Sequence, residues 1–444
     1  MQQLIGIELL AATSEERFTL DELVIKVREL FTQSGMAKVV ELILKLVDEL
    51  LAIKHCQGQM PKPRVCACGQ SCYELKDRLK RQVRTSVGVL KFLWRRLICR
   101  QCGKGWCPLR EFLGLEAWQR KSGELERIAV EVLSEQSYRR GARHLAVAGE
   151  IPVPKSTLHR WVVQTQAAEW KAPAEPLTAL LADGTGYKRR ADPAHKKDPR
   201  GELRVMVGRT QQGHWKAIGA WSGKSWAEIV KELSPEGGSP TLQAHTLVSD
   251  GENGLAQSLA RIAQGQQRCP WHLVRDLNIA LWKDGVSLEQ RRAGQQQLSE
   301  VVGIELPAGE LELVKAEERQ ALAERVKKAE EQLEELVRTL RLQGYTRAAN
   351  YVADAQGKLF RYVQFWLETG VVCPRTTGWL ERMMRELGRR LKKIAFGWSH
   401  EGAARMACVI LRRITDQKEW DAYWCQRLGL ADNVTLSLRA VKAL

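Results

Sequence analysis

The sequence predicts an α/β domain that contains an all-helical insertion and follows helical and cysteine-rich N-terminal regions. Between residues 173 and 284, short apolar runs and amphipathic segments alternate in the order β, β, β, α, β, α, β, α. Residues 285–357 replace this alternation with helical periodicity and with charges of both signs at i, i+4 spacing. Six of the eleven cysteines lie within residues 64–108, which sets that segment apart from the rest.

Proline-containing segments near residues 58–63 and 171–176 divide the chain further. The predicted regions are an N-terminal helical region (1–58), a cysteine-rich region (59–115), a second helical region (116–172), the first part of the α/β domain (173–284), the insertion (285–357), and the second part of the α/β domain with C-terminal helices (358–444).

The composition is that of a folded, basic protein. The 444 residues correspond to about three domains, and 35 Gly and 14 Pro are too few for a collagen-like or low-complexity chain. The 69 Lys and Arg exceed the 52 Asp and Glu, which gives a net charge of +17. A protein this basic usually binds a polyanion, most often nucleic acid.

The sequence also indicates a compartment. No basic segment followed by an apolar one follows Met1, and the most apolar stretch, 39–53, is interrupted by four charged residues. A membrane span needs ~20 mostly apolar residues, so no membrane contact is expected. We expect the cysteines to stay reduced, in the cytoplasm or in association with the nucleoid.

Two cysteine pairs, Cys66-Ala-Cys68 and Cys99-Arg-Gln-Cys102, flank a predicted hairpin over residues 81–98 that turns at Val87-Gly88-Val89. Two such pairs supply the four thiolates of a zinc ribbon. We therefore expect Cys66, Cys68, Cys99 and Cys102 to bind one structural Zn²⁺ in a zinc-ribbon-like DNA-binding domain. Because Cys-x-Cys is tighter than the usual spacing, Cys72 could replace Cys66 or Cys68.

Residues 139–164 are typical of a helix-turn-helix. A helix over 139–148 precedes the turn Gly149-Glu-Ile-Pro-Val-Pro, and Ser156 is the expected N-cap of a helix over 157–164. The first residues of such a second helix contact DNA, which selects Thr157, His159 and Arg160 as candidates. The alternative is a helical hairpin that only packs.

Two acidic residues are each expected to end a buried strand: Asp183 in Leu-Leu-Ala-Asp-Gly-Thr-Gly and Asp250 in Leu-Val-Ser-Asp-Gly-Glu-Asn-Gly. Carboxylates on two strands can hold hard cations, and two metals can clamp the oxygens of a phosphodiester. The third carboxylate must come from a helix. Glu381 fits best, and Glu386, one turn later, is the alternative. A plain turn would explain either Asp alone, but less readily both.

These acids, the motif Cys269-Pro-Trp-His272 and the late Glu381 together resemble the Mutator-like DDE transposases. The tail beginning Gly397-Trp-Ser-His resembles the bacterial insertion-sequence branch, as does the cysteine-rich region followed by Pro108-Leu-Arg-Glu-Phe-Leu-Gly-Leu. The Cys-x-x-His motif after the second Asp is the most specific part. The resemblance covers roughly residues 60–415 and implies an RNase H-like (retroviral-integrase-like) fold. One departure is Asp276, where relatives often have Asn.

The resemblance implies a DNA transposase that binds the ends of its element, hydrolyses the 3′ ends and joins them to target DNA. It also implies Mg²⁺ or Mn²⁺ on Asp183, Asp250 and Glu381, a role for His272 in organising the site, and a homodimer or higher oligomer on double-stranded DNA.

The residues after Glu381 carry charge suited to the same partner. Between residues 381 and 413 there are nine Lys or Arg and three Glu. Such a strip is expected to bind backbone phosphates; its central candidates are Arg389, Arg390, Lys392 and Lys393. Trp271 and Trp398 could stack on unpaired bases.

Two other functions compete with this interpretation. A transposase-derived DNA-binding protein without catalysis would have lost one of the carboxylates, and all three candidates are present. An RNase H-like nuclease acting in DNA recombination would not need the N-terminal ribbon and helix-turn-helix, which suit a protein that finds specific DNA ends.

Overall fold

The computed structural model describes residues 24–25, 28–31, 35–148, 151–169, 173, 175–190, 200–234, 241–252, 254–394 and 397–430. Contacts divide the chain into two units, Met1–Val132 with Tyr138–Leu158, and Leu133–Ser137 with His159–Leu444. The boundary passes through helices α4 (Gly123–Glu135) and α6 (Lys155–Gln164). The predicted region 116–172 is therefore shared between the two units.

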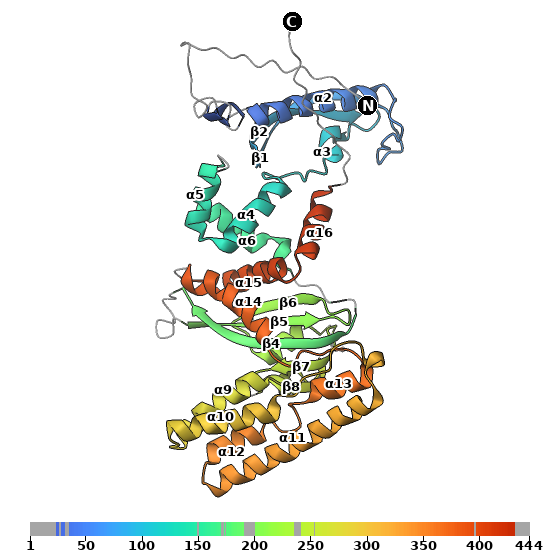
Figure 1. Ribbon diagram of the computed structural model, residues 1–444. Coiled ribbons are helices and arrows are strands. Elements are labelled where there is room, and N and C mark those ends of the chain that lie inside the picture. Colours follow the sequence, from blue (N-terminus) through green and yellow to red (C-terminus); the bar gives the residue numbers. More distant parts are fainter. Residues whose placement is uncertain are drawn as a thin grey trace. The chain divides into compact units, whose positions relative to one another are not determined.

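The first unit is built on a long antiparallel hairpin (Figure 1). Its strands are β1 (Tyr73–Thr85) and β2 (Gly88–Cys99), and a short β3 (Gly105–Trp106) pairs with the end of β2. The turn closes at the pair Thr85 and Gly88, where Gly88 has a φ of +115° that side chains rarely adopt. The predicted hairpin is present and starts earlier in the chain than residue 81.

Helix α2 (Met36–Cys56) packs against β2. Its apolar residues, at helical spacing, meet the apolar residues that alternate along the hairpin: Val40, Leu44, Val47 and Leu51 against Val83, Leu90, Phe92 and Trp94. The helix also covers the strand edge, because Glu41 accepts a hydrogen bond from the Lys91 backbone N–H at 2.6 Å. The buried Asp48 accepts the Arg95 N–H at 3.0 Å. These carboxylates accept hydrogen bonds from backbone N–H groups at the edge of β2. Without such partners, the edge would be available to pair with another strand.

The first unit also contains α3 (Pro108–Phe112) and α5 (Tyr138–Ala148).

The second unit contains a five-stranded mixed sheet in the order β6-β5-β4-β7-β8. The strands are β4 (Leu177–Lys188), β5 (Arg200–Arg209), β6 (Trp215–Ser222), β7 (Ala244–Ser249) and β8 (Ala263–Arg268). Strands β4, β5 and β6 run antiparallel, whereas β7 and β8 are parallel to β4. With α7 (Trp226–Glu232), α8 (Leu255–Leu259) and α9 (Pro270–Lys283), the chain follows the predicted order.

Helices cover the sheet on both faces. On one face, Leu180 and Ala182 of β4 join a core with Ile229 of α7 and Leu259 of α8. Because side chains alternate along a strand, Asp183 lies on the other face. There α14 (Gly378–Gly388) contacts β4 and α15 (His400–Thr415) contacts β6 (Figure 1). Helix α16 (Gln417–Leu428) follows α15.

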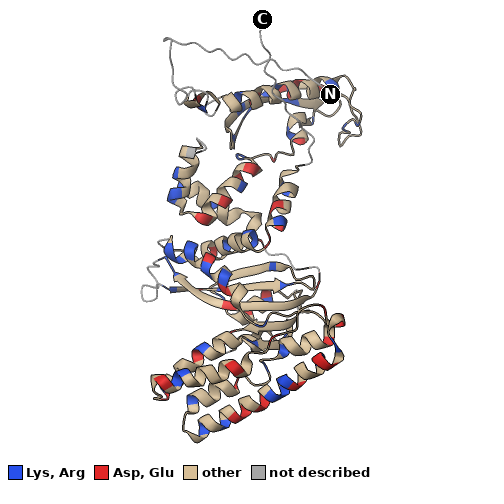
Figure 2. Cartoon of the chain, in the orientation of Figure 1, with Lys and Arg blue, Asp and Glu red and all other residues tan. Residues whose placement is uncertain are grey.

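Residues 285–357 are helical, as predicted. They form α10 (Leu288–Val302), α11 (Ala316–Leu342) and α12 (Thr346–Ala353). Both α10 and α12 contact α9, and α11 contacts α12, so this layer is anchored to the helix that follows β8. Basic and acidic side chains alternate along α11 (Figure 2). Helix α13 (Arg361–Thr369) then returns the chain to β8.

In the described part of the chain, no helix has the length and apolar character needed to cross a membrane.

Candidate functional site

The register of the parallel strands places the two predicted aspartates side by side. The last β4–β7 pair is Leu181 with Val248. Asp183 and Asp250 each follow that pair by two residues, so they stand at the same level of the sheet.

The electrostatics of Asp183 reflect this arrangement. Burial, then the negative charge of Asp250 and, to a smaller extent, that of Glu252 raise the pKa of Asp183, whose net value is about 6. The Gly184 N–H, which donates to Asp183 Oδ1 at 2.6 Å, and the charge of His272 oppose this rise. Asp250, Glu252 and His272 therefore all act on the same carboxyl group.

One detail of the prediction is wrong. Asp183 does not end its strand, because β4 continues to Lys188 and pairs antiparallel with β5, with Asp183 opposite Val205. Only the parallel pairing with β7 ends before Asp183. Asp250 does follow its strand directly, since β7 ends at Ser249.

The turn after Asp250 brings a carboxylate that sequence reasoning missed. Asp250 Oδ1 accepts the Glu252 N–H at 2.9 Å, and Glu252 in turn accepts the Trp226 indole N–H at 3.2 Å. Burial raises the pKa of Glu252, and the charge of Asp250 adds to this rise. Between the two acids, Gly251 has a φ of +87°, and a Cβ there would overlap the buried Arg268.

Glu381 lies in the first turn of α14, beside His272. Its Oε1 is 3.7 Å from His272 Nε2 and accepts a hydrogen bond from Thr377 Oγ1 at 3.0 Å. The same hydroxyl is 3.2 Å from His272 Nδ1 and 3.5 Å from Cys269 Sγ. Thr377 was not among the predicted residues.

Glu386, the alternative third carboxylate, instead forms an ion pair with Arg389 at 2.9 Å. Glu381 is therefore the one of the two that contacts the predicted histidine, and its role as a metal ligand stays a prediction.

Cys269 and His272 are placed by the start of α9. Cys269 precedes the helix, with Pro270 in its first turn, and the Cys269 N–H donates to Ser249 O at 2.8 Å. This bond ties the motif to the end of β7, beside Asp250. Burial lowers the pKa of His272, but the hydrogen bond and charge of Cys269 outweigh it, so the net shift is upward.

Among the described residues, the metal-binding side chains that approach one another most closely are not these acids. The one group whose ligand atoms all lie within 4.8 Å of one another is Cys66, Cys68, Cys99 and Cys102. Asp183, Asp250 and Glu381 do not form such a group. Asp183 and Asp250 lie at one end of the β4–β7 pair, and Glu381 lies beside His272, whose charge acts on Asp183.

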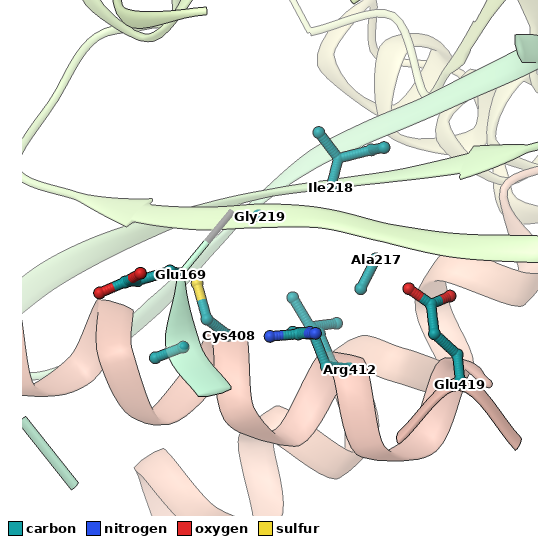
Figure 3. A pocket seen from close by; sticks show the side chains of 9 residues that line it. Glu169, Ala217, Ile218, Gly219, Cys408, Arg412 and Glu419 are labelled. Carbon is teal, nitrogen blue, oxygen red and sulfur yellow. The ribbon is translucent and has the colours of Figure 1, made fainter. Parts of the chain in front are cut away.

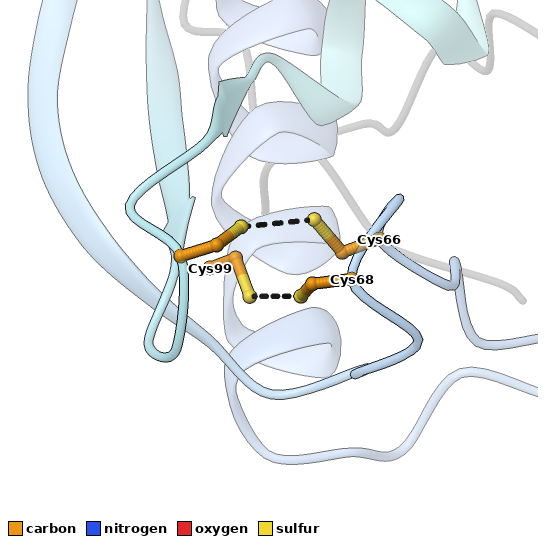
Figure 4. A group of neighbouring side chains, drawn as sticks. Cys66, Cys68 and Cys99 are labelled. Atoms are coloured by element: carbon orange, nitrogen blue, oxygen red, sulfur yellow. Dashed lines mark hydrogen bonds between the residues drawn. The ribbon is translucent and has the colours of Figure 1, made fainter.

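The four predicted cysteines come together in the first unit (Figure 4). Cys66 Sγ lies 3.5 Å from Cys102 Sγ, and Cys68 Sγ lies 3.5 Å from Cys99 Sγ. A zinc tetrahedron with Zn–S bonds of about 2.3 Å has sulfurs about 3.8 Å apart, so the cluster could hold a zinc ion. Cys72 is not part of it.

Local structure favours the thiolate form of one of these cysteines, Cys99. Cys99 ends β2, and backbone N–H groups of Cys102 and Gln101 lower the pKa of the Cys99 thiol to about 7. The thiolate is the form that binds metal. Gly69 and Gly103, with φ of +86° and +68°, turn the chain after each pair.

The helix-turn-helix candidates lie on α6. His159 and Arg160 are exposed and Thr157 is half-buried. The helix begins at Lys155, so Ser156 lies inside its first turn and is not the N-cap. Gly149 and Glu150 of the predicted turn lie outside the described residues. DNA contact by α6 stays a prediction.

The basic strip divides into exposed and buried members. Arg389, Lys392 and Lys393 are exposed, and Lys392 Nζ donates to Thr185 Oγ1 at 2.8 Å. Arg390 is only 2% exposed, donates to Leu133 O at 2.8 Å and stacks on the Trp398 ring at 4.7 Å. The assignment of Arg390 to a DNA-binding surface is therefore wrong.

The two tryptophans considered for base stacking also differ. Trp398 is buried, and its backbone forms a parallel bridge with Arg189 at the end of β4. It is a packing residue. Trp271 is 52% exposed, with the Arg275 guanidinium 4.9 Å from its ring centre, so stacking by Trp271 stays a prediction.

A hollow between β6, α15 and α16 is too small for a metabolite (Figure 3). Its volume is about 40 Å³, whereas ligand pockets usually measure about 300–1,000 Å³. The lining residues include Ala217, Ile218, Cys408, Arg412 and Glu419. The hollow gives no support to a small-molecule enzyme.

No protein-family model matches the sequence, and a search of curated proteins finds no relative.

Proposed function

We propose that the protein is a Mutator-like DDE transposase of a bacterial insertion sequence, with an RNase H-like catalytic domain. The observation that carries the proposal is the placement of Asp183 and Asp250 two residues beyond one parallel strand pair. The contact between His272 and Glu381 supports it. So does the helical segment that lies between Asp250 and Glu381 in the chain.

The donor set fits a hard cation. The charge of Asp250 raises the pKa of Asp183, and this repulsion between carboxylates is one that Mg²⁺ or Mn²⁺ relieves. Asp183, Asp250 and Glu381 would hold the metal. When bound, it would lower the pKa of the attacking water or 3′-hydroxyl and neutralise charge on the phosphate.

The chain's own residues supply the remaining requirements. His272 holds or accepts a proton at Nε2, next to Glu381. Arg389, Lys392 and Lys393, all exposed, bind backbone phosphates of the element ends and of target DNA. The four cysteines hold Zn²⁺ and so stabilise the N-terminal ribbon as a DNA-binding module. Such a protein would act as a dimer or higher oligomer in the prokaryotic nucleoid.

The test uses purified full-length protein and a supercoiled plasmid that carries the gene with its flanking DNA. With Mg²⁺ or Mn²⁺ we expect cleavage at the element ends, followed by joining of the 3′ ends to target DNA. Asp183→Asn and Asp250→Asn should abolish both steps while end binding in a gel-shift assay persists.

The other functions predict different results. Binding without cleavage by the wild-type protein would indicate a catalytically silent DNA-binding protein. Cleavage without joining would indicate a nuclease. Either result overturns the proposal.

A further inference from the structure

We propose that Thr377 is a positioning residue that fixes both Glu381 and His272 through a single hydroxyl group. The inference rests on the proposed function, because it concerns the same acidic site. Thr377 immediately precedes α14 and is 1% exposed, although Thr is a residue type that usually faces solvent.

Three reactive side chains surround the Thr377 hydroxyl. Its Oγ1 lies 3.0 Å from Glu381 Oε1, 3.2 Å from His272 Nδ1 and 3.5 Å from Cys269 Sγ. These groups come from α14 and from the start of α9, which are far apart in the sequence. The hydroxyl is therefore the atom that links the third carboxylate to the Cys-x-x-His motif.

The number of protons decides the direction of each hydrogen bond. A hydroxyl has one proton, and an ionised carboxylate can only accept. The Thr377 proton therefore goes to Glu381, and the oxygen accepts from His272 Nδ1–H. The other ring nitrogen, Nε2, then faces Glu381 at 3.7 Å. The partner of one ring nitrogen sets which nitrogen carries the proton.

This arrangement has a consequence for the imidazole. Both the neutral ring with a proton on Nδ1 and the doubly protonated ring donate from Nδ1 to Thr377. Without the hydroxyl, Nδ1 loses this acceptor while the Cys269 side chain still hydrogen-bonds His272, so the preference for a proton on Nδ1 becomes weaker.

Two substitutions separate the effect of the Thr377 hydroxyl from the effect of the shape of the side chain. Thr377→Val keeps the shape and removes the hydroxyl, whereas Thr377→Ser keeps the hydroxyl. Thr376→Val is the matched control, because Thr376 Oγ1 accepts only the Gly378 N–H at 3.4 Å and contacts neither Glu381 nor His272 in the described structure.

The first measurement is the tautomer of His272, read from ring-¹⁵N NMR spectra of the metal-free full-length protein and assigned with His272→Gln. We expect a proton on Nδ1 in the wild type, Thr377→Ser and Thr376→Val, and a weaker preference for Nδ1 in Thr377→Val. A wild-type ring with its single proton on Nε2 overturns the proposal without any variant.

The second measurement is Mn²⁺-dependent cleavage of the plasmid that carries the element. Residues that orient a metal ligand typically change activity by about 10–100-fold, and we expect a loss in this range for Thr377→Val, with rescue by Thr377→Ser. Unchanged cleavage in a folded Thr377→Val also overturns the proposal. If the wild type does not cleave, the proposed function fails, and the tautomer still decides the role of Thr377.

Discussion

Ionisation of Asp183 destabilises the folded state of the metal-free protein. Burial and the charge of Asp250 raise its pKa to about 6. A carboxyl group with a raised pKa binds its proton more tightly in the folded state than in the unfolded state. Its effect is therefore to lower the free energy of unfolding as pH rises through its unfolded pKa toward about 6. Above that pH, Asp183 lowers the free energy of unfolding by its full amount.

We expect the Tm of the metal-free protein to fall more steeply between pH 4 and 7 than that of Asp183→Asn, measured by differential scanning fluorimetry. Each unit of pKa shift corresponds to about 1.4 kcal/mol, so Asp183→Asn should gain on the order of 1–3 kcal/mol at pH 7. Mg²⁺ or Mn²⁺ should reverse the order of the two proteins at pH 7. Parallel pH curves for the two proteins would contradict this account of the pair.

A second prediction for a single residue concerns which glutamate, Glu381 or Glu386, is the third metal ligand. Glu381→Gln keeps the size of the side chain but removes the charge next to His272. A bound metal lowers the activation barrier of cleavage by several kcal/mol. We therefore expect loss of the ligand to reduce cleavage on the order of 100-fold or more. Glu386→Gln, which breaks only the exposed pair with Arg389, is the control and should cleave normally. The reverse result would make Glu386 the ligand.

At the level of elements, the first unit has a core that depends on a three-stranded sheet and one long helix. The end of its hairpin is closed by the cysteine cluster, which packs under α2 through Ala52, Tyr73 and Leu97. Small modules of this kind often obtain their folding free energy from the metal.

We therefore expect about one Zn²⁺ per chain, measured by elemental analysis. The double variant Cys99→Ser/Cys102→Ser should lose the metal, and protease should then cut the first unit. Cys72→Ser should keep both the metal and protease resistance, since Cys72 is outside the cluster. Zinc retained by the double variant would refute the site.

The periodicity of the sequence was sufficient to predict most elements of the second unit. It predicted the order in which β5, β6, α7 and β7 follow one another, because each alternates or repeats locally. It failed after Asp183, where Gly-Thr-Gly is typical of a turn but continues β4 against β5. That pairing depends on a partner strand, which local sequence does not encode.

The sequence predicted those residues of the candidate site that belong to recognisable motifs. The cysteine pairs, the two aspartates and Cys-x-x-His carry recognisable spacings, whereas Thr377 and Glu252 carry none. Arg390 illustrates another limit, because a count of charges takes no account of burial. It lies in the π-helical turn η5 (Arg389–Lys393), where it is buried although its neighbours Arg389 and Lys392 are exposed.

At the level of the whole molecule, the excess of positive charge should appear as salt-dependent DNA binding. Each phosphate contact contributes about 0.9 to the slope of log K against log salt. We expect the triple variant Arg389→Ala/Lys392→Ala/Lys393→Ala to reduce this slope by about 3 in fluorescence titrations with duplex DNA. Arg390→Ala should leave the slope unchanged and lower Tm, because it removes a buried contact with Trp398. An unchanged slope in the triple variant would show that DNA binds to a surface other than the one formed by these three residues.

The order of the site residues along the chain affects how the protein is made. Domains fold as units while the chain emerges, starting from the N-terminus. The cysteine cluster and Asp183 are synthesised long before Thr377 and Glu381, with the whole helical segment 285–357 between them. A nascent or truncated chain that stops before α14 therefore has the cysteine cluster but an incomplete set of acids. Under the proposed function, such a fragment would occupy element ends without cutting them, so premature termination would produce an inhibitor of the full-length enzyme.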